Sequence, residues 1–296
     1  MTVVRAKAPA KINLGLEITG RRPDGFHDIV TIFQTIDLQD SLRVSPDHQL
    51  RLKVDDPLLQ GESNLALRAA KSLQERFSSA KGANIRLEKN IPLAAGLGGA
   101  SSDAAATLRA LSLLWEIEPT TAEVIEVASS LGSDAPFFLT GGTALGRGRG
   151  EIVQPLSNQV SAWVVLVVPS LVLENKTATM FGMLNDSDFT SGGTVLALSE
   201  RIEAGESIIG VELPNTFSRH AFKVWPILDA LSEEFRSAGA RGVSLSGAGP
   251  SLFTLVGDEA EATFMRDRMI NRVSSKARVF LCQTTSHTPL PVRDNR

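Results

Sequence analysis

The sequence predicts an α+β protein built from two domains, roughly residues 1–155 and 156–296. Three observations support this prediction. The chain has 296 residues, which exceeds the size at which one hydrophobic core usually divides into two. Strand-like and helix-like segments alternate along both halves. A glycine-rich loop, "RGRGEIVQPLSNQV", precedes a strongly apolar segment, and we expect the domain boundary near residues 150–160.

The first half is expected to begin with strands near residues 3–18, 29–37, 41–45, 50–54 and 83–88. A helix is expected over 63–77, where Ser63 or Asn64 can cap the first turn. A second helix follows a glycine-rich stretch and runs through "SSDAAATLRALSLLW". A third, "TTAEVIEVASSLG", should open on Thr120 or Thr121 and end at Gly132. The run "FFLTGGTALG" after it is strand-like.

The second half contains the longest apolar run, "AWVVLVVP" at residues 162–169, which predicts a buried strand. It is far shorter than the roughly 20 residues that cross a bilayer. The further expected elements are a helix at 175–185, helices across 194–237, strands at 242–246 and 251–256, a helix at 258–272 and a strand at 277–282. The segment 185–206 suggests no function from its sequence.

Composition is that of a folded globular protein, with 43% hydrophobic and 21% charged residues. A net charge of -3 provides no basic field for nucleic acid. The single cysteine, Cys282, excludes an internal disulfide, and the four histidines lack zinc-ligand spacing. We therefore expect a cytoplasmic protein that acts on neither nucleic acid nor membrane, with monomer and homodimer both open.

The first strand carries a regular alternation in "PAKINLGLEI", residues 9–18. Alternation with period two predicts one apolar and one polar face. The apolar face would hold Ile12, Leu14, Leu16 and Ile18, and the polar face Lys11, Asn13, Gly15 and Glu17. Taken alone, a lysine on such a strand is usually solvated surface charge.

The stretch "IPLAAGLGGASSDAA", residues 91–105, combines glycines with the start of an amphipathic helix. Glycines let backbone N–H groups approach a ligand, and a helix N-terminus attracts an anion. The stretch lacks the lysine of a Walker loop and the last glycine of the dinucleotide fingerprint. It therefore predicts a phosphate site of another kind, with a purely structural glycine turn as the alternative.

A second glycine turn, "LSGAGPSLFTLV" at residues 245–256, lies between two short apolar segments. Taken alone it predicts a tight hairpin. Paired with the first glycine turn, it could form the opposite wall of a phosphate site.

Three segments in this order, "PAKINLGLEITGRRPDGFH", "IPLAAGLGGASSDAA" and "SGAGPSLF", resemble the three signatures of the GHMP small-molecule kinases. The segments "LGSDAPFFLTGGTALGRGRGE" and "LPNTFSRHAF" also resemble family segments, so the resemblance covers nearly the whole chain. It implies a two-domain kinase that uses ATP with Mg²⁺ and has its active site in the cleft between domains. No metal ligand is assigned.

The resemblance also implies roles for particular residues. Lys11 and Asp134 would be the catalytic pair, with Asp134 as the base and Lys11 as the stabilising charge. The residues that would bind ATP are Pro92, Leu93, Ala94, Ala95, Gly96, Leu97, Gly98, Gly99, Ala100, Ser101 and Ser102. The third glycine motif would contribute Ser246, Gly247 and Gly249.

The segment "PDGFH" resembles that of one branch of the superfamily. The acceptor of that branch is a cytidine diphosphate-linked methylerythritol, which is phosphorylated on its 2-hydroxyl. By this resemblance His27 would read the cytosine edge and Phe26 would stack on its face. Thr177 would contact the erythritol part and Phe181 the other side of the base. Asn13 would orient the acceptor with neutral hydrogen bonds.

Two departures from the family pattern and two alternatives accompany this interpretation. The chain contains no tyrosine, so a stacking position often filled by tyrosine is phenylalanine here. Ala95 and Ala100 occupy glycine positions of the family turn and add methyl groups where phosphate approaches. The alternatives are another GHMP kinase, of homoserine or mevalonate type, and a catalytically silent nucleotide-binding protein on the same fold.

Overall fold

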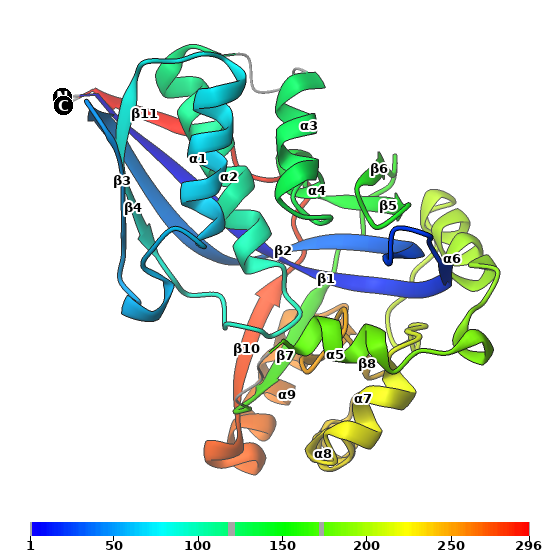
Figure 1. Cartoon of the computed structure of the whole chain (residues 1–296). Coiled ribbons are helices and arrows are strands. Elements are labelled where there is room, and N and C mark those ends of the chain that lie inside the picture. The colour runs from blue at the N-terminus through cyan, green and yellow to red at the C-terminus, as the bar shows by residue number, and fades with distance from the viewer. Residues whose placement is uncertain (1, 118–121, 172–174, 296) are drawn as a thin grey trace.

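The chain folds into two β-sheets that lie between two groups of helices (Figure 1). The computed structural model describes residues 2–117, 122–171 and 175–295. This arrangement confirms the expected α+β class. The opening of the third helix, expected at Thr120 or Thr121, lies outside the described residues.

The larger sheet contains seven strands in the described part of the chain, in the order β11-β1-β2-β4-β3, with β5 paired to β2 and β6 paired to β5. Its pairs are antiparallel except β3 with β4. The strands are β1 (Thr2–Arg21), β2 (His27–Asp47), β3 (Leu50–Val54), β4 (Gly82–Glu88), β5 (Thr143–Arg147), β6 (Ile152–Pro155) and β11 (Val292–Asn295).

The smaller sheet is antiparallel throughout and has four strands in the described residues, in the order β10-β7-β9-β8. The strands are β7 (Trp163–Pro169), β8 (Ser244–Leu245), β9 (Leu252–Val256) and β10 (Ala277–Gln283). Strands β8 and β9 pair as a hairpin around the second glycine turn, as the sequence predicted.

Helices cover the outer faces of both sheets (Figure 1). The larger sheet is covered by α1 (Leu65–Arg76), α2 (Gly99–Trp115) and α3 (Ala122–Leu131). On the far side of the smaller sheet lie α7 (Ser218–Val224), α8 (Ile227–Ala238) and α9 (Glu259–Val273). The remaining helices are α4 (Phe137–Thr140), α5 (Lys176–Gly182) and α6 (Gly193–Glu203). Short 3₁₀ turns occupy Pro57–Leu59, Asp186–Asp188 and Ser274–Lys276.

The core continues from one sheet to the other. Val164 and Leu166 of β7 pack with Ile12 and Leu14 of β1, whereas Val165 on the opposite face of β7 packs against α8 and α9. Both faces of β7 are therefore buried, which confirms the buried strand predicted at residues 162–169. Because apolar side chains fill the space between the sheets, the two halves of the chain are held together by a hydrophobic junction.

Several expected elements differ in extent from the prediction. The strands expected at 29–37 and 41–45 form one continuous strand, β2. The helix expected from residue 63 begins at Leu65, because the Asn64 side chain caps it by accepting a hydrogen bond from Ala66 N at 2.9 Å. The helices expected across 194–237 are interrupted, since α6 ends at Glu203 and α7 begins at Ser218.

The strand-like interpretation of "FFLTGGTALG" is wrong for its first half. Phe137–Thr140 forms the short helix α4, and the strand β5 begins only at Thr143. Pro136 stands in the helical region of the backbone and starts the turn. A short apolar run cannot distinguish a buried helical turn from a buried strand by periodicity, and that ambiguity caused the error.

The C-terminal strand β11, which the sequence did not predict, returns to the larger sheet. It pairs with β1 in antiparallel register, with Thr2 opposite Asn295 and Arg5 opposite Val292. Residues 1–155 therefore contain six strands of the larger sheet, whereas β11 joins the same sheet from the C-terminal end of the described chain. The isolated bridge between Ile36 and Thr284 shows the chain crossing back along β2.

The alternation predicted for β1 holds only as far as a β-bulge at Leu14. Asn13 pairs with Phe33 and Gly15 pairs with Ile32, which leaves Leu14 as the extra residue. Such an insertion shifts the phase of the strand by one residue. Lys11 and Asn13 consequently share a face with Leu16 and Ile18, whereas Ile12 faces the same side as Gly15 and Glu17. The single polar face predicted for the segment is wrong, and neither face is open to solvent.

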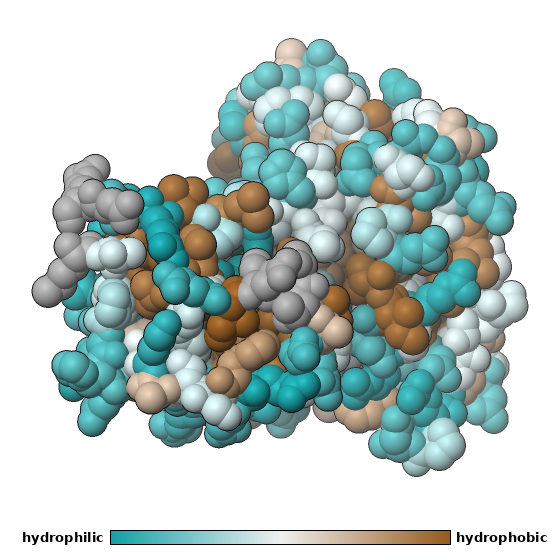
Figure 2. Space-filling view, turned by 90° about the horizontal axis from the view of Figure 1, so that it is seen from above, coloured by the Kyte–Doolittle hydropathy of each residue, from teal (hydrophilic) through white to brown (hydrophobic). Residues whose placement is uncertain are grey.

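The surface seen from above mixes hydrophilic and hydrophobic residues (Figure 2). This is expected where amphipathic helices cover a sheet, as α1 does by burying Ala66, Ala69 and Leu73 toward the core. Among the described residues, no helix combines the length and the apolar character that crossing a membrane requires.

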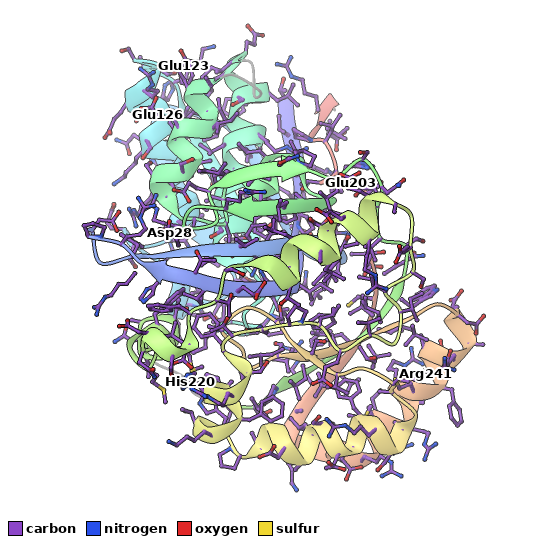
Figure 3. The ribbon with its side chains drawn as sticks, turned by 90° about the vertical axis from the view of Figure 1, so that its right-hand side faces the viewer. Asp28, Glu123, Glu126, Glu203, His220 and Arg241 are labelled. Carbon is purple, nitrogen blue, oxygen red and sulfur yellow. The ribbon has the colours of Figure 1, made fainter. Side chains whose placement is uncertain are left out.

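Helix α6 gives the segment 185–206 a structural role. Its backbone N–H at Val195 donates to the buried Glu17 carboxylate at 2.7 Å, and α6 lies across β1 with Glu203 at its end (Figure 3). A Cβ atom added at Gly15 would lie 3.0 Å from the Val195 side chain. Glycine at position 15 therefore allows α6 to approach β1 closely.

We predict that Gly15→Val lowers the free energy of unfolding by about 1–3 kcal/mol, because the added side chain overpacks the contact with α6. The measurement is urea denaturation followed by circular dichroism. Gly20→Val on the same strand is the matched control, since a Cβ atom there meets nothing within 4 Å. Equal stability of the two variants would contradict the proposed packing role.

Candidate active site

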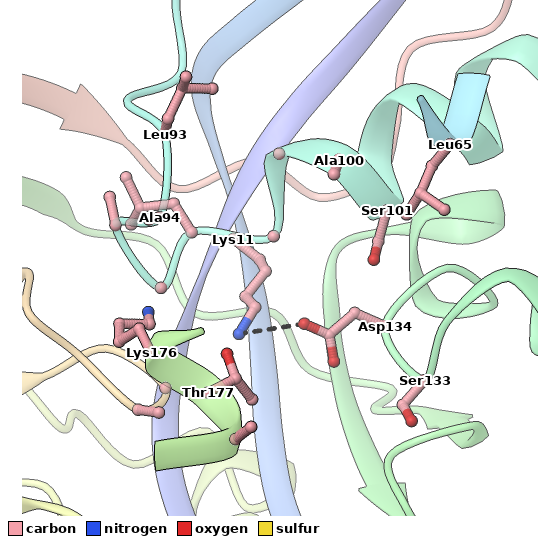
Figure 4. A pocket seen from close by; sticks show the side chains of 18 of the residues that line it. Lys11, Leu65, Leu93, Ala94, Ala100, Ser101, Ser133, Asp134, Lys176 and Thr177 are labelled. Atoms are coloured by element: carbon pink, nitrogen blue, oxygen red, sulfur yellow. Dashed lines mark ion pairs between the residues drawn. The ribbon is translucent and has the colours of Figure 1, made fainter. Parts of the chain in front are cut away.

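A cavity of about 1140 Å³ opens along β1 and reaches into the junction of the two sheets. It is lined by the first glycine turn, the hairpin between β1 and β2, the turn before α4, helix α5 and the second glycine turn. Figure 4 shows Lys11 at its centre, with Asp134 on one side and Lys176 and Thr177 on the other.

The first glycine turn meets the cavity with its backbone. Gly96 and Gly98 have φ values of 82° and 71°, which glycine adopts without a steric penalty. Gly98 is the N-cap of α2, so the unpaired N–H groups of the first helical turn face the same cavity. The backbone N–H of Lys11 donates to Leu97 O at 2.9 Å and anchors the turn to β1. A phosphate group bound here would meet backbone donors and the positive end of the helix dipole.

The second glycine turn is packed directly on the first. Ser251 Oγ donates to Ala95 O at 2.6 Å, and Ser246 Oγ donates to Gly96 O at 3.1 Å. A Cβ atom at Gly96 would lie 2.4 Å from Ser246 O, so only glycine permits this approach. The two motifs, about 150 residues apart in sequence, thus form adjoining walls of one site.

Lys11 is the central side chain of the cavity and is almost fully buried. Its ammonium nitrogen lies 3.4 Å from Asp134 Oδ2 and donates to Asn13 Oδ1 at 2.6 Å. Asn13 Nδ2 in turn donates to Thr31 Oγ1 at 2.8 Å, and Thr31 donates to Gly15 O at 2.7 Å. This chain of hydrogen bonds fixes the direction in which Lys11 points.

Asp134 reaches the cavity from the turn between α3 and α4. That turn is closed by a hydrogen bond from Ala135 N to Gly132 O at 3.1 Å. The Asp134 side chain keeps 29% of its surface exposed, against 6% for Lys11. The carboxylate is therefore paired with a buried cation and remains accessible to a ligand in the cavity.

Behind the first glycine turn lies a buried group of one cation and two carboxylates. Lys89 Nζ donates to Asp103 Oδ2 at 2.5 Å and also to Asp40 Oδ2. Asp40 Oδ1 accepts hydrogen bonds from Asn90 N and Ile91 N, which holds the entry to the turn. Burial, opposed by Lys89 and reinforced by the neighbouring Asp40, raises the pKa of Asp103 to about 8. Asp103 Oδ1 is buried and without a hydrogen-bond partner in the described residues.

The other end of the cavity is formed by the β1–β2 hairpin and α5, and Asp28 marks that hairpin in Figure 3. The His27 ring lies 5.0 Å from that of Phe181, and Phe181 packs edge-on against Phe217 at 4.9 Å. Phe26 is half exposed at the hairpin tip, with the Arg149 guanidinium 4.7 Å from its ring. Burial and the nearby Arg21 charge lower the pKa of His27, so its imidazole is neutral at pH 7.

Most of the residues that the sequence suggested for binding line this one cavity. The lining includes the whole run 92–101 together with Lys11, Asn13, Phe26, His27, Asp134, Thr177, Phe181 and Gly247. Ser102, Ser246 and Gly249 do not line it. The hydroxyl of Ser102 is buried and donates to Pro9 O at 2.6 Å, so it joins the turn to β1.

Five charged residues of the cavity were not singled out from the sequence: Arg21, Lys89, Asp103, Arg149 and Lys176. Lys89 lies two residues before the glycine stretch and Asp103 lies within it, and these positions were the available signal. Lys176 lies at the start of the helix expected at 175–185, and Arg21 and Arg149 lie in the segments "GRRPDG" and "GRGRGE". A charged residue at such a position is normally exposed to solvent. Burial, with the Lys11 charge nearby, lowers the pKa of Lys176 to about 8.

Both halves of the chain are similar to known proteins of one family. The family model "GHMP kinases N terminal domain" matches residues 64–142, and "GHMP kinases C terminal" matches residues 213–275. A relative from Dehalococcoides mccartyi, named 4-diphosphocytidyl-2-C-methyl-D-erythritol kinase, is 41% identical over 86% of this chain and 90% of its own. A relative of the same name from Exiguobacterium sibiricum is 38% identical over 88% and 92%.

Solved structures give the same fold. A crystal structure of 4-(cytidine 5'-diphospho)-2C-methyl-D-erythritol kinase superposes with a TM-score of 0.78 at 35% identity, covering 95% of this chain and 98% of that one. A homoserine kinase from Cytophaga hutchinsonii superposes with a TM-score of 0.79 at 19% identity, covering 99% and 97%. At that identity the homoserine kinase shows a shared fold alone.

We predict that Asp103→Asn gains stability relative to the wild type as the pH rises from 5 to 9. The folded-state pKa of Asp103, about 8, lies above the ordinary value of about 4, so folded wild type binds more protons in this window. Its stability therefore falls as the pH rises through the window. Asparagine does not titrate, and the difference in unfolding free energy from urea denaturation should grow with pH.

The contrasting variant is Asp40→Asn, which removes the carboxylate that holds Lys89 and the backbone of residues 90 and 91. It should be destabilised at both ends of the pH range. A stability difference between Asp103→Asn and the wild type that stays constant from pH 5 to 9 would contradict the pKa assigned to Asp103.

Proposed function

The chain belongs to the 4-diphosphocytidyl-2-C-methyl-D-erythritol kinase family of GHMP kinases, and from this premise we propose the reaction that it catalyses. It transfers the terminal phosphoryl group of ATP to the 2-hydroxyl of 4-diphosphocytidyl-2-C-methyl-D-erythritol, giving the 2-phosphate and ADP. This is a step of the non-mevalonate route to isoprenoid precursors. The observation that carries the proposal is the Lys11–Asp134 pair, at 3.4 Å, between a phosphate-binding turn and an aromatic hairpin.

The donor would occupy the end of the cavity beside α2. Residues 92–101 offer backbone donors and a helix N-terminus to the phosphates of ATP. Ala95 is buried and its carbonyl accepts a hydrogen bond from Ser251 Oγ, so this residue joins the two glycine turns. Ala100 is exposed on the first turn of the helix.

The acceptor would lie toward the hairpin. A neutral imidazole offers one hydrogen-bond donor and one acceptor, which suits the edge of a cytosine. This chemistry supports the assignment of His27 to hydrogen bonding with the base. Phe181, whose ring contacts that of His27, and Phe26, which lines the same end of the cavity, would provide the stacking surfaces. Arg21 and Arg149 line the same end and supply positive charge for the diphosphate of the acceptor.

The chemical step requires alignment, a base and compensation of charge. Asp134 would accept the proton of the attacking hydroxyl, because it is the accessible member of the ion pair. Lys11 would stabilise the negative charge on the transferring group. Asn13 already accepts a hydrogen bond from Lys11, so it acts mainly by orienting the lysine and only secondarily on the acceptor.

Mg²⁺ would accompany ATP. Among the residues that the structure describes, no three His, Cys, Asp or Glu side chains gather into a metal site. Mg²⁺ commonly takes few protein ligands and completes its coordination with phosphate oxygens and water. The Ser101 hydroxyl, which points into the cavity (Figure 4), fits that limited role. The bound ion would neutralise phosphate charge.

We predict that ADP release will depend on 4-diphosphocytidyl-2-C-methyl-D-erythritol. Mevalonate, homoserine and galactose should give kcat/KM values at least about 100-fold lower, because they leave the polar groups of the hairpin unpaired. A coupled spectrophotometric assay of ADP measures this. Comparable turnover of any of the three would refute the acceptor assignment, and turnover of none of the four acceptors would favour a silent nucleotide-binding protein.

We predict that Asp134→Asn and Lys11→Met each lower kcat by about 10²- to 10⁴-fold, through loss of the base and of the stabilising charge. Nucleotide binding, measured by isothermal titration, should persist in Asp134→Asn because the glycine turn is intact. Asp229→Asn, on the exposed face of α8, is the matched control and should keep wild-type kcat. If Asp134→Asn retains more than half of the wild-type kcat, Asp134 is not the base.

A further inference from the structure

The cavity contains a second buried ammonium group besides that of Lys11. Lys176, the first residue of α5, is 8% exposed and lines the cavity. Its Nζ donates a hydrogen bond to Gly249 O, in the second glycine turn. Figure 4 shows the Lys176 side chain directed toward the first glycine turn, on the side of Lys11 opposite Asp134.

The charges at this point of the cavity do not balance. Lys11 and Lys176 contribute two ammonium groups, and Asp134 is the one carboxylate that acts on Lys176 electrostatically within the described residues. An ammonium group has three N–H donors, and Gly249 O is the only acceptor that the structure describes for Lys176. A buried, incompletely paired cation is costly unless a ligand supplies the missing charge.

The position of Lys176 indicates which ligand supplies it. Gly249, its hydrogen-bond acceptor, approaches Gly96 of the first glycine turn so closely that a Cβ atom at Gly96 would lie 2.7 Å from Gly249 O. Lys176 therefore stands beside the turn that is suited to the donor phosphates. The diphosphate of the acceptor has other cations available, Arg21 and Arg149, at the hairpin end.

We propose that Lys176 is a second phosphate-binding cation of this active site, and that its ammonium group contacts the phosphate chain of ATP beside Lys11. The inference rests on the proposed function in taking ATP as the donor. It adds a binding residue that neither glycine motif contains. Two lysines and the α2 N-terminus then surround the charge that moves during transfer.

Protonation of Lys176 is coupled to this binding. The pKa of its ammonium group, about 8 without ligand, is lowered by burial and by Lys11 and raised by Asp134. Arg21, Arg149 and His27 also face the same cavity, at its other end. Phosphate oxygens beside the amine favour its charged form, so nucleotide binding near pH 8 should draw a proton from solution.

A buried lysine with a lowered pKa could instead serve as a general base. The two roles predict opposite effects of arginine, which is always charged and cannot accept a proton. As a phosphate-binding cation, Lys176→Arg should remain active and become insensitive to pH between 7.5 and 9.5. As a base, Lys176→Arg should be inactive, and wild-type kcat should rise through pH 8.

The first experiment is isothermal titration of the whole chain with Mg²⁺ and adenosine 5'-(β,γ-imido)triphosphate at pH 8, in buffers of different ionisation enthalpy. Wild type should take up about half a proton per nucleotide bound. Lys176→Met should take up none and bind about 10- to 100-fold more weakly, the usual range for a lost charge-assisted hydrogen bond. The matched control is Lys223→Met, an exposed lysine of α7, which should behave as wild type.

The second experiment measures the pH dependence of kcat/KM for each substrate. Wild-type kcat/KM for ATP should fall above pH 8, and that of Lys176→Arg should not. Thermal denaturation separates binding from folding, because removing an uncompensated buried amine should leave the melting temperature unchanged or raise it. A lowered melting temperature with normal nucleotide affinity would mean a structural role and would overturn the proposal.

Three further results would also overturn it: wild-type nucleotide affinity in Lys176→Met, no proton uptake by wild type, or a higher KM for the cytidine acceptor alone. The last result would assign Lys176 to the acceptor diphosphate. Because the titration uses nucleotide without acceptor, it tests Lys176 even if the cytidine compound is not the substrate. Failure of the acceptor assay with normal Lys176-dependent nucleotide binding would refute only the proposed acceptor.

Discussion

The hydrogen bond between Lys11 N and Leu97 O joins the two features on which the cavity depends. One residue thus fixes the first glycine turn through its backbone and holds Asp134 through its side chain. A displacement of β1 would shift the first glycine turn and the central cation together. The strand is buried between α2 on one side and the smaller sheet on the other, so packing on both faces resists such a displacement.

The bulge at Leu14 adapts this strand to two different tasks. Before the bulge, the cavity face carries Lys11 and Asn13, and after it the same face carries Leu16, which lines the cavity, and Ile18. After the bulge the opposite face carries Gly15 and Glu17, which contact α6. Without the extra residue, Glu17 would turn toward the apolar cluster around Phe217 and Met180. The local irregularity is therefore what lets one strand serve both the cavity and the domain junction.

Sequence reasoning succeeded where a local signal determined a local structure. Asn64 caps α1, β7 is a buried strand, and the two glycine turns lie where their glycines indicated. It failed where the outcome depended on long-range contacts. The alternation of β1 was predicted to be uninterrupted, because a β-bulge becomes visible only in the pairing with the neighbouring strand. Strand β11 was not predicted, because it is held by pairing with a strand nearly 290 residues away. Lys176 was missed because the burial of a lysine at the start of a helix depends on what packs around it.

The two ends of the cavity carry different kinds of charged side chain. Guanidinium groups, at Arg21 and Arg149, stand near the hairpin, whereas ammonium groups, at Lys11 and Lys176, stand near the glycine turns. Arginine forms flat, bidentate contacts suited to a diphosphate that stays in place, and lysine is a compact point charge that can follow a phosphate group as it moves. The carboxylate of Asp134 is paired with Lys11 and open to the cavity. In the reaction that we propose, this arrangement would place the donor phosphates beside the two lysines and the reacting hydroxyl next to Asp134.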